Sequence, residues 1–343
     1  MLLDTIKELC ALSGPSSYET PVRNYICRRA KATGCEMRVD GMGSLIVTKK
    51  RAVPGTKKLM LTAHMDEVGL IVKRITDDGY IKFACLGDID RRVLIGKQIW
   101  LGKSRVPGVI GMKAVHLTAA AERGVIPKLE SLYIDIGARD RAEAESLTHL
   151  GDFAVFTDDV QDFGHGMLKA KALDDRVGCA IMVELFEREL PMDCTFAFTV
   201  QEEVGNRGAF GAGFSVKPDL ALVLEGTNAA DSPATDNHLQ ICTPGKGPVI
   251  PYMDEVSISD RAMFELLRTL ADEHNIPWQT KECITGGTDA GAIQRSRGGV
   301  RVAVLAAPVR YICSPAWVGA SEDFYNMQKL TECFILAVAD GRI

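Results

Sequence analysis

The sequence predicts an α/β fold: a mostly parallel sheet flanked by helices, with a smaller β-rich module inserted into it. Strand-like apolar runs alternate with helix-length amphipathic segments at both ends of the chain, as in proteins with a parallel sheet. Residues 67–164 instead contain short apolar runs separated by turn signals, which is typical of a small all-β module. With 343 residues, the chain is long enough for two domains. We therefore expect an α/β domain from residues 1–66 and 165–343 and a β domain from residues 67–164.

The segment before the insertion is expected to hold two helices and then two strands. Apolar residues recur at near-helical spacing from the start of the chain until the breaker cluster Ser13-Gly14-Pro15. A second helical pattern follows, and after it come two short β-rich runs. The expected bounds are residues 2–12 and 19–31 for the helices, and Ser44–Thr48 and Leu59–Ala63 for the strands.

Helical and strand patterns alternate again after the insertion. This alternation predicts crossover connections, which place helices on both faces of a parallel sheet. The expected helices are Asp175–Arg188, Asp260–His274 and Ser321–Ala339, and the expected strands are Cys194–Val200, Leu220–Leu224 and Val300–Leu305.

The composition excludes several classes of function. Forty basic against 45 acidic residues give a net charge of −5, which opposes non-specific nucleic-acid binding, and no polybasic patch for a membrane surface is present. No apolar run approaches the ~18 residues of a transmembrane helix, and charged residues within the first ten argue against a signal peptide. Ten cysteines without a CxxC pair indicate free thiols in a reducing compartment. We expect a cytoplasmic protein without nucleic-acid or membrane partners.

Side chains that can bind a metal or transfer a proton follow several of the expected strands or begin an expected helix. In a parallel α/β sheet, binding sites form at the carboxyl ends of the strands. The candidates are His64-Met65-Asp66, Asp174-Asp175, Glu202-Glu203, Glu225 and Cys313.

The first two motifs each have a functional and an ordinary interpretation. Positions i and i+2 of a strand share a face, so Asp66 can orient or polarise His64, as carboxylates do for metal-bound imidazoles. The ordinary interpretation is a surface histidine near a turn. The acidic pair Asp174-Asp175 stands before an expected helix, and in isolation we interpret it as helix capping.

The remaining carboxylates indicate a metal site more strongly together than each does alone. Adjacent Glu202 and Glu203 repel each other unless cations neutralise them, so one could bind a metal while the other moves a proton; a solvated loop is the alternative. Glu225, taken alone, is an ordinary acid at a strand end. Together with His64 and the thiol of Cys313, these carboxylates form a ligand set that suits a pair of zinc, cobalt or manganese ions.

A glycine-rich stretch, Gly286-Gly287-Thr288-Asp289-Ala290-Gly291, is a further candidate. It lacks the Gly-Lys-Ser/Thr of a phosphate-binding loop. Its expected use is close backbone approach to a substrate through Gly287 and Thr288, with Asp289 as a hydrogen-bond acceptor; a plain turn is the alternative. No GxSxG motif occurs, which excludes a nucleophile-elbow hydrolase.

Six motifs in this order resemble the tetrahedral (TET) metallo-aminopeptidases, a group that includes glutamyl, leucyl and deblocking aminopeptidases, some once labelled endoglucanases. The resemblance covers essentially the whole chain. The motifs are TAHMDEVG (62–69), KALDDRVGCA (171–180), QEEVGNRGA (201–209), LEGT (224–227), GGTDAGAI (286–293) and RYICSP (310–315).

The resemblance implies a fold, an assembly and a cofactor. The implied fold is a zinc-peptidase α/β domain with an inserted β-barrel-like dimerisation domain. The implied assembly is a homododecamer built from dimers, and the implied substrates are peptides. Two divalent metal ions per chain are implied, zinc or cobalt first and manganese as a further option.

The resemblance also assigns a role to each residue of the matching motifs. Carried over position by position, the metal ligands are Asp174 as the bridge, His64 and Glu225 on one metal, and Glu203 with Cys313 on the other. Glu202 becomes the general base, and Asp66 supports His64.

Cys313 is a departure, because the matching family position holds histidine. A thiolate is a good zinc ligand, so we expect Cys313 to substitute for it. The alternative is a protonated thiol with a weak or absent second metal. The resulting hypothesis is a metal-dependent aminopeptidase. Its rivals are a weak or inactive assembly protein and a glycosidase with paired carboxylates; the latter is disfavoured because Glu202 and Glu203 are adjacent in sequence.

Overall fold

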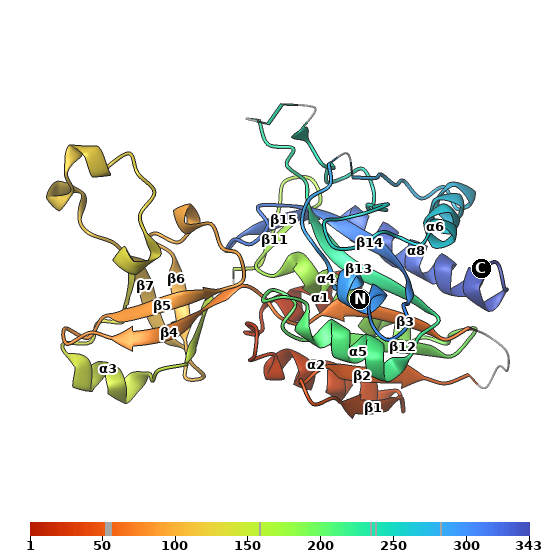
Figure 1. Cartoon of the computed structure of the whole chain (residues 1–343), viewed down its shortest axis with the longest axis horizontal. Helices are drawn as coiled ribbons and strands as arrows, with labels where there is room; N and C mark the ends of the chain where they lie inside the picture. The colour runs from red at the N-terminus through yellow and green to blue at the C-terminus, as the bar shows by residue number, and fades with distance from the viewer. Residues whose placement is uncertain (52–56, 158, 234, 237–238, 282) are drawn as a thin grey trace.

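A mixed β-sheet forms the centre of the larger body of the molecule (Figure 1). The computed structural model describes residues 1–51, 57–157, 159–233, 235–236, 239–281 and 283–343. Within these residues the sheet has nine strands, in the order β1-β2-β12-β3-β13-β14-β15-β11-β10. The strands are β1 Glu36–Val39, β2 Leu45–Lys49, β3 Leu59–His64, β10 Gln161–Phe163, β11 Met167–Ala170, β12 Cys194–Thr199, β13 Leu220–Asn228, β14 Arg301–Arg310 and β15 Trp317–Ala320.

The centre of this sheet is parallel and its margins are antiparallel. β12, β3, β13 and β14 run in the same direction, whereas β2 pairs antiparallel with β12 and β15 pairs antiparallel with β14. Only a short segment joins β14 to β15, and a parallel pair would need a crossover of about a dozen residues. The α/β fold is therefore confirmed, with a parallel character that is limited to the centre of the sheet.

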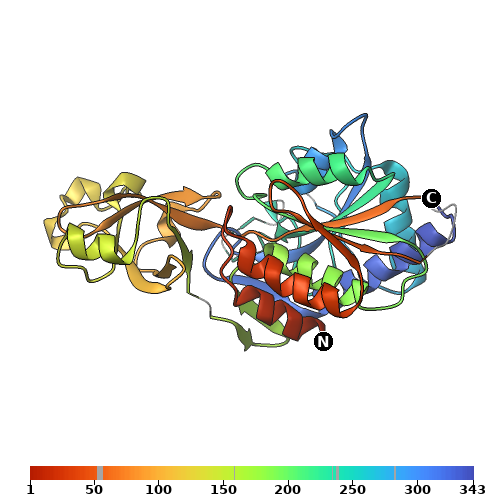
Figure 2. The same cartoon turned by 90° about the horizontal axis from the view of Figure 1, so that it is seen from below.

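Helices cover both faces of the sheet, and each face has its own apolar core. Alternate residues of β13 divide between the cores, with Leu222 on the face that α4 and α8 cover and Val223 on the face that α5 and α7 cover. This division explains why the strand is apolar without interruption, since both of its faces are buried. Figure 2 shows α1 and α2, in red, side by side on one side of the body. The helices are α1 Leu2–Cys10, α2 Thr20–Ala32, α3 Arg141–Leu147, α4 Leu173–Phe186, α5 Arg207–Val216, α6 Arg261–Glu273, α7 Asp289–Gln294 and α8 Ser321–Ala339.

A closed barrel with its own apolar core lies to one side of this body (Figures 1 and 2). Its strand order is β4-β5-β8-β7-β6-β9, and every pairing is antiparallel. The main sheet resumes at β10, just before the predicted domain boundary at residue 165. The strands are β4 Gly69–Ile75, β5 Ile81–Leu86, β6 Gln98–Leu101, β7 Val106–Gly111, β8 Tyr133–Asp135 and β9 Phe153–Phe156. Short 3₁₀ helices are Arg91–Val93, Val115–Leu117, Ala120–Glu122 and Leu129–Ser131.

The helices were also compared with the requirements of a membrane span. In the part of the chain that the structure describes, no helix has the length and apolar character that a span requires.

Candidate metal centre

The parallel strands bring the predicted side chains to one edge of the sheet. His64 is the last residue of β3, and Glu225 lies within β13, which runs in parallel with β3 and continues beyond Glu225 to Asn228. Glu202 and Glu203 follow β12, and Cys313 follows β14. Because β12, β3, β13 and β14 are parallel, their carboxyl ends meet at the same edge, where α/β proteins place their sites.

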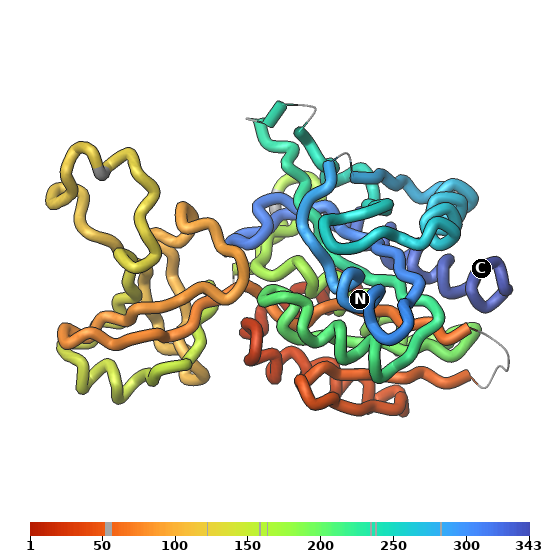
Figure 3. Tube along the Cα trace, in the orientation of Figure 1, coloured from red at the N-terminus to blue at the C-terminus, as the bar shows by residue number. Residues whose placement is uncertain are grey.

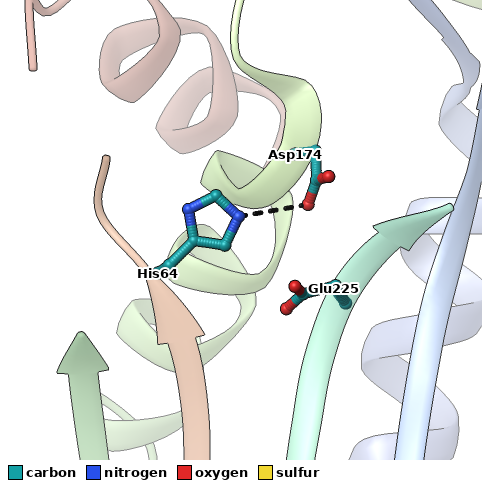
Figure 4. A group of neighbouring side chains, drawn as sticks. All are labelled: His64, Asp174 and Glu225. Carbon is teal, nitrogen blue, oxygen red and sulfur yellow. Dashed lines mark ion pairs between the residues drawn. The ribbon is translucent and has the colours of Figure 1, made fainter. Parts of the chain in front are cut away.

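His64, Asp174 and Glu225 form a group that could hold a metal ion (Figure 4). One ligand atom from each lies within 4.8 Å of the others, and all three residues are buried. His64 Nε2 is 3.4 Å from Asp174 Oδ1, and Figure 4 shows Glu225 directed into the same space from β13. One imidazole and two carboxylates are a donor set that suits zinc and similar divalent ions.

Asp66 holds the other side of the His64 ring. His64 Nδ1 lies 3.0 Å from the Asp66 backbone oxygen and 3.5 Å from Asp66 Oδ1, which leaves Nε2 for the ligand side. The Asp66 carboxylate in turn accepts hydrogen bonds from Ser16 Oγ at 2.6 Å and from the backbone N–H of Glu202 at 2.9 Å and of Glu203 at 3.2 Å. Asp66 therefore connects the position of His64 to that of the two glutamates.

The two aspartates at the start of α4 have different roles: one caps the helix and the other faces the metal group. Asp175 accepts hydrogen bonds from the backbone N–H of Gly178 at 2.9 Å and of His64 at 3.2 Å. Because Asp174 and Asp175 have non-helical backbone angles, Asp175 caps the regular part of α4, which begins after it. Asp174 turns toward the metal group, where its Oδ1 accepts from the backbone N–H of Gly226 at 2.8 Å. A Cβ on Gly226 would lie 2.6 Å from the Cβ of Asp174, so this approach requires glycine after Glu225.

Buried oxygens in this region lack a partner. Glu203 Oε1 and Glu225 Oε2 are buried without a hydrogen bond among the described residues. Burial raises the pKa of Glu203 and of Glu225 well above the usual carboxyl value, and neighbouring carboxylates raise it further against the opposing charge of His64. Such groups need a positive charge close to them. The residues present therefore fit a bound divalent cation.

The same carboxylates stabilise the protonated form of His64. Burial by itself lowers the pKa of His64, but the hydrogen bonds to Asp174 and Asp66 and the charges of Glu202 and Glu225 raise it well above its usual value. A bound metal ion would replace the proton that these carboxylates favour, since a ligating histidine is neutral.

Glu202 lies beside the metal group and is held by one hydrogen bond from a side chain. Its Oε2 is 3.9 Å from His64 Nε2, and its Oε1 accepts from Asn206 Nδ2 at 2.7 Å. Burial raises the pKa of Glu202 to about 8, with contributions from Asp289 and Asp66. A carboxylate in this position can accept and return a proton. Asn206 was missed by the sequence analysis, although it lies in the quoted motif QEEVGNRGA.

The glycine-rich stretch forms the start of α7. Thr288 caps the helix by accepting from the N–H of Ala290, and its hydroxyl donates to Asp254 Oδ2 at 2.9 Å. A Cβ on Gly287 would meet the Val256 side chain at 2.9 Å, so close packing requires this glycine. The substrate contacts predicted for Gly287 and Thr288 remain predictions.

Asp289 makes its contacts with side chains of the body. Its Oδ2 accepts from Thr199 Oγ1 at 2.5 Å, and its Oδ1 accepts from Asn206 Nδ2 at 3.2 Å. Asp289 thus reaches Glu202 through Asn206. Its predicted contact with substrate remains a prediction.

Cys313 and Glu203 lie outside the group formed by His64, Asp174 and Glu225 among the described residues. The backbone of Cys313 has φ 55°, and its side chain packs against the edge of the barrel core. Burial raises the pKa of the thiol strongly, and the Glu203 charge is the next contribution. Metal ligation by Cys313 and Glu203 therefore remains a prediction.

A buried ion cluster, which the sequence analysis missed, forms between Glu67, Lys171 and Arg176. Lys171 Nζ is 2.7 Å from both carboxylate oxygens of Glu67 and also donates to the Leu12 carbonyl. Arg176 Nη2 is 3.6 Å from Glu67 Oε1, and Arg176 Nε donates to the Met65 carbonyl. The cluster therefore fixes the strand end around His64 to the start of α4, which carries Asp174.

Comparison with known proteins places this arrangement in a family. The M42 glutamyl aminopeptidase model matches residues 43–330. A candidate aminopeptidase of Acetivibrio thermocellus is 36% identical over 331 residues, covering 96% of this chain and 97% of that protein. A TET aminopeptidase from a marine sediment archaeon, Thaumarchaeota archaeon SCGC AB-539-E09, is 31% identical with a TM-score of 0.94, covering 100% of this chain and 99% of that one. The TET1 peptidase of Pyrococcus horikoshii, which can assemble into a tetrahedron or a large octahedral shell, is 32% identical with a TM-score of 0.86, covering 97% of this chain and 98% of that one. This chain belongs to the M42 glutamyl aminopeptidase family.

Proposed function

We propose that this protein is a metal-dependent aminopeptidase that removes N-terminal residues from peptides. The observation that carries the proposal is the group of His64, Asp174 and Glu225, with the Glu202 carboxylate 3.9 Å from His64 Nε2. Metal ligands next to a carboxylate that can move a proton are the parts that metal-assisted amide hydrolysis needs. Membership of an aminopeptidase family supports peptides as the substrates.

We propose two metal positions that share Asp174. His64 and Glu225 complete the first position, and the unpartnered Glu225 Oε2 supports it. Glu203 and Cys313 complete the second, and the unpartnered Glu203 Oε1 supports that one. Zinc or cobalt is the proposed ion, with manganese as a further option, and a bound ion of this class polarises the scissile carbonyl and lowers the pKa of water.

Glu202 is the proposed general base. It accepts a proton from the attacking water and returns it to the amine that leaves. Asn206 holds Glu202 Oε1, so Oε2 is directed toward His64, and Asp66 fixes the backbone of Glu202. These contacts keep the carboxylate in one orientation.

We further propose that the protein works in the cytoplasm as a homododecamer built from dimers. The Pyrococcus horikoshii relative can assemble into a tetrahedron or a large octahedral shell, and a shared fold supports self-association here. The barrel exposes apolar side chains that a partner could cover, including Val115 at 69% and Val125 at 66% exposure. No disulfide joins cysteines of the described residues, which fits a reducing compartment.

The rival functions fit the site less well. An inactive assembly protein has no need for Glu202 to be held at the metal group, and a glycosidase has no use for His64 between two carboxylates. The experiment that tests the proposal is hydrolysis of aminoacyl p-nitroanilides by protein reconstituted with zinc, cobalt or manganese. We expect turnover that a chelator abolishes and metal restores. Equal turnover with and without chelator, or none with any metal, would contradict the proposal.

A further inference from the structure

The turn that follows β5 brings the barrel into contact with the metal centre. Gly87 has φ 87°, and a Cβ there would lie 2.8 Å from Val68 Cγ1 and 3.3 Å from Glu203 Oε2. The barrel backbone therefore rests against the carboxylate of Glu203. Figures 1 and 3 show this orange turn on the side of the barrel that is nearest to the larger body.

Asp88 is the next residue after Gly87, and it is exposed. Cys313 also packs against the edge of the barrel core. Because Gly87 rests against the Glu203 carboxylate, the next residue, Asp88, lies close to the side of the centre that Glu203 forms.

No cation of the described residues neutralises Asp88. The two arginines that follow it in the turn are engaged elsewhere: Arg92 pairs with Asp90, and Arg91 donates to the Pro127 carbonyl. An unpaired carboxylate at the entrance to a site attracts cationic groups and repels anionic ones. An aminopeptidase substrate carries such a cation, because its N-terminal amine is an ammonium group before it binds.

We propose that Asp88 binds an ammonium group of the peptide substrate, so that the inserted barrel takes a direct part in substrate recognition. The proposal rests on the proposed aminopeptidase function. The ammonium is either the N-terminal α-ammonium or the ε-ammonium of an N-terminal lysine. Asp88 is a substrate-binding residue and performs no chemical step, so its loss weakens substrate binding and leaves the turnover rate of the bound substrate unchanged.

The test compares Asp88→Asn with the control Glu130→Gln. Glu130 is also an exposed barrel carboxylate, it is remote from Gly87 along β5, and its loss changes the net charge by the same amount. Exposed ion pairs are weak, so we expect KM of Asp88→Asn to rise about two- to fivefold with kcat unchanged, and KM of Glu130→Gln to stay at the wild-type value. Added salt should reduce the difference.

Two substrates distinguish the two sources of the ammonium group. Leucine p-nitroanilide carries only the α-ammonium, whereas lysine p-nitroanilide carries both. A rise in KM for both substrates assigns the α-ammonium, and a rise for lysine p-nitroanilide alone assigns the ε-ammonium. Equal KM values in Asp88→Asn and Glu130→Gln for both substrates would overturn the proposal.

Inhibitor binding gives a second measurement that does not depend on turnover. Leucine hydroxamate carries the α-ammonium, and 4-methylpentanohydroxamate lacks it. If Asp88 binds the α-ammonium, the preference of the wild type for the first compound should shrink about two- to fivefold in Asp88→Asn. If the wild type hydrolyses neither anilide with any metal, the proposed function fails, which differs from a failure confined to Asp88→Asn.

Discussion

The side-chain amide of Asn206 donates to Glu202 Oε1 at 2.7 Å. The same nitrogen lies 3.2 Å from Asp289 Oδ1, so one amide connects the partly buried carboxylate of Glu202 with the buried carboxylate of Asp289. Burial raises the pKa of Asp289 to about 6 and that of Glu202 to about 8. Since Asn206 occupies Oε1, Oε2 is the oxygen left to face His64 and to exchange a proton. Glu202 thus has one oxygen for orientation and one for chemistry.

Glu202→Gln should abolish turnover and leave the metal content close to that of the wild type. Glutamine keeps the shape of the side chain but cannot accept a proton, so we expect kcat to fall by about 10²–10⁴-fold. Metal per chain is measured by mass spectrometry, and kcat with an aminoacyl anilide. Glu145→Gln, an exposed change on α3, is the matched control. Loss of metal from Glu202→Gln alone would make Glu202 a ligand instead of a base.

Asn206→Asp should move the acidic limb of the pH profile upward. The new negative charge beside Glu202 disfavours its ionised form, so the pKa of Glu202 rises and the active, ionised base appears only at higher pH. Aspartate tolerates the left-handed backbone of this position, φ 54°, so the loop should persist. The measurement is kcat/KM against pH for both proteins. An unshifted limb with an equal loss of activity at every pH would indicate a purely structural role.

Much of the fold follows from patterns that act locally. α8 occupies Ser321–Ala339, as expected, and α6 occupies Arg261–Glu273 against an expected Asp260–His274. Both are amphipathic segments with apolar residues at helical spacing, and helices are predicted most reliably from long periodic segments. The strands that carry His64 and Glu225 were also expected, because their apolar runs are buried on both faces.

Elements that depend on tertiary packing were missed. α5, Arg207–Val216, contains glycines that lower its intrinsic helix propensity. The structure explains one of them: a Cβ on Gly208 would lie 2.5 Å from the Val200 carbonyl oxygen, so the helix packs close to β12 only with glycine there. The Lys171–Glu67 pair joins residues that are 104 positions apart, a contact that no local pattern indicates.

The candidate site was only partly accessible to reasoning from the residues. Asp174-Asp175 reads as a helix cap, and Asp175 is one; nothing local indicates that Asp174 turns away toward His64. The resemblance to the aminopeptidases supplied that role. The contact of Asn206 with Asp289 could not be predicted from a local pattern, because the two residues are 83 positions apart in the sequence.

Without metal, the protein should lose stability as the pH rises from about 5 to about 8. The pKa of Glu202 is raised from 4.5 to about 8. Its contribution to the free energy of unfolding is therefore complete below pH 4.5 and is lost as the pH rises through about 8. Burial likewise raises the pKa of Glu203 and Glu225, and the raised pKa of His64 acts in the same direction. A bound cation stabilises the ionised carboxylates and should flatten this dependence.

The measurement is the melting temperature against pH, with chelator and with excess zinc. We expect the two curves to diverge as the pH rises. Glu225→Gln removes one of the raised carboxyl groups, so its chelated form should show a shallower slope than the chelated wild type. Parallel curves with and without metal would contradict the expected linkage.

Metal stoichiometry tests the role of Cys313. As a ligand it must be a thiolate, so bound metal should protect it from alkylation and chelation should expose it. Cys313→Ser should weaken the metal held with Glu203 and spare the one held by His64 and Glu225. Cys313→His should strengthen it and favour cobalt or manganese over zinc. If the wild type and Cys313→Ser bind equal metal with equal affinity, Cys313 is not a ligand.

Gly226→Ala tests whether the position of Asp174 determines metal binding. An alanine Cβ at residue 226 would lie 2.6 Å from the Asp174 Cβ and 2.7 Å from its Cγ, so Asp174 must move away from His64 and Glu225. Because Asp174 is the proposed bridge, we expect metal affinity to fall by at least about tenfold, within the range found when a group that orients a ligand is lost.

Gly211→Ala is the matched control for this change. A Cβ at Gly211 would meet only Asp40 Oδ2, at 3.7 Å, and the residue lies within α5. Alanine is the better helix former, so this variant should bind metal normally and gain about 0.5–1 kcal/mol in the free energy of unfolding. Calorimetric titration of chelated protein with zinc gives the affinities. If Gly226→Ala also binds zinc with wild-type affinity, Asp174 tolerates displacement, and the close approach of β13 to α4 serves packing instead of ligation.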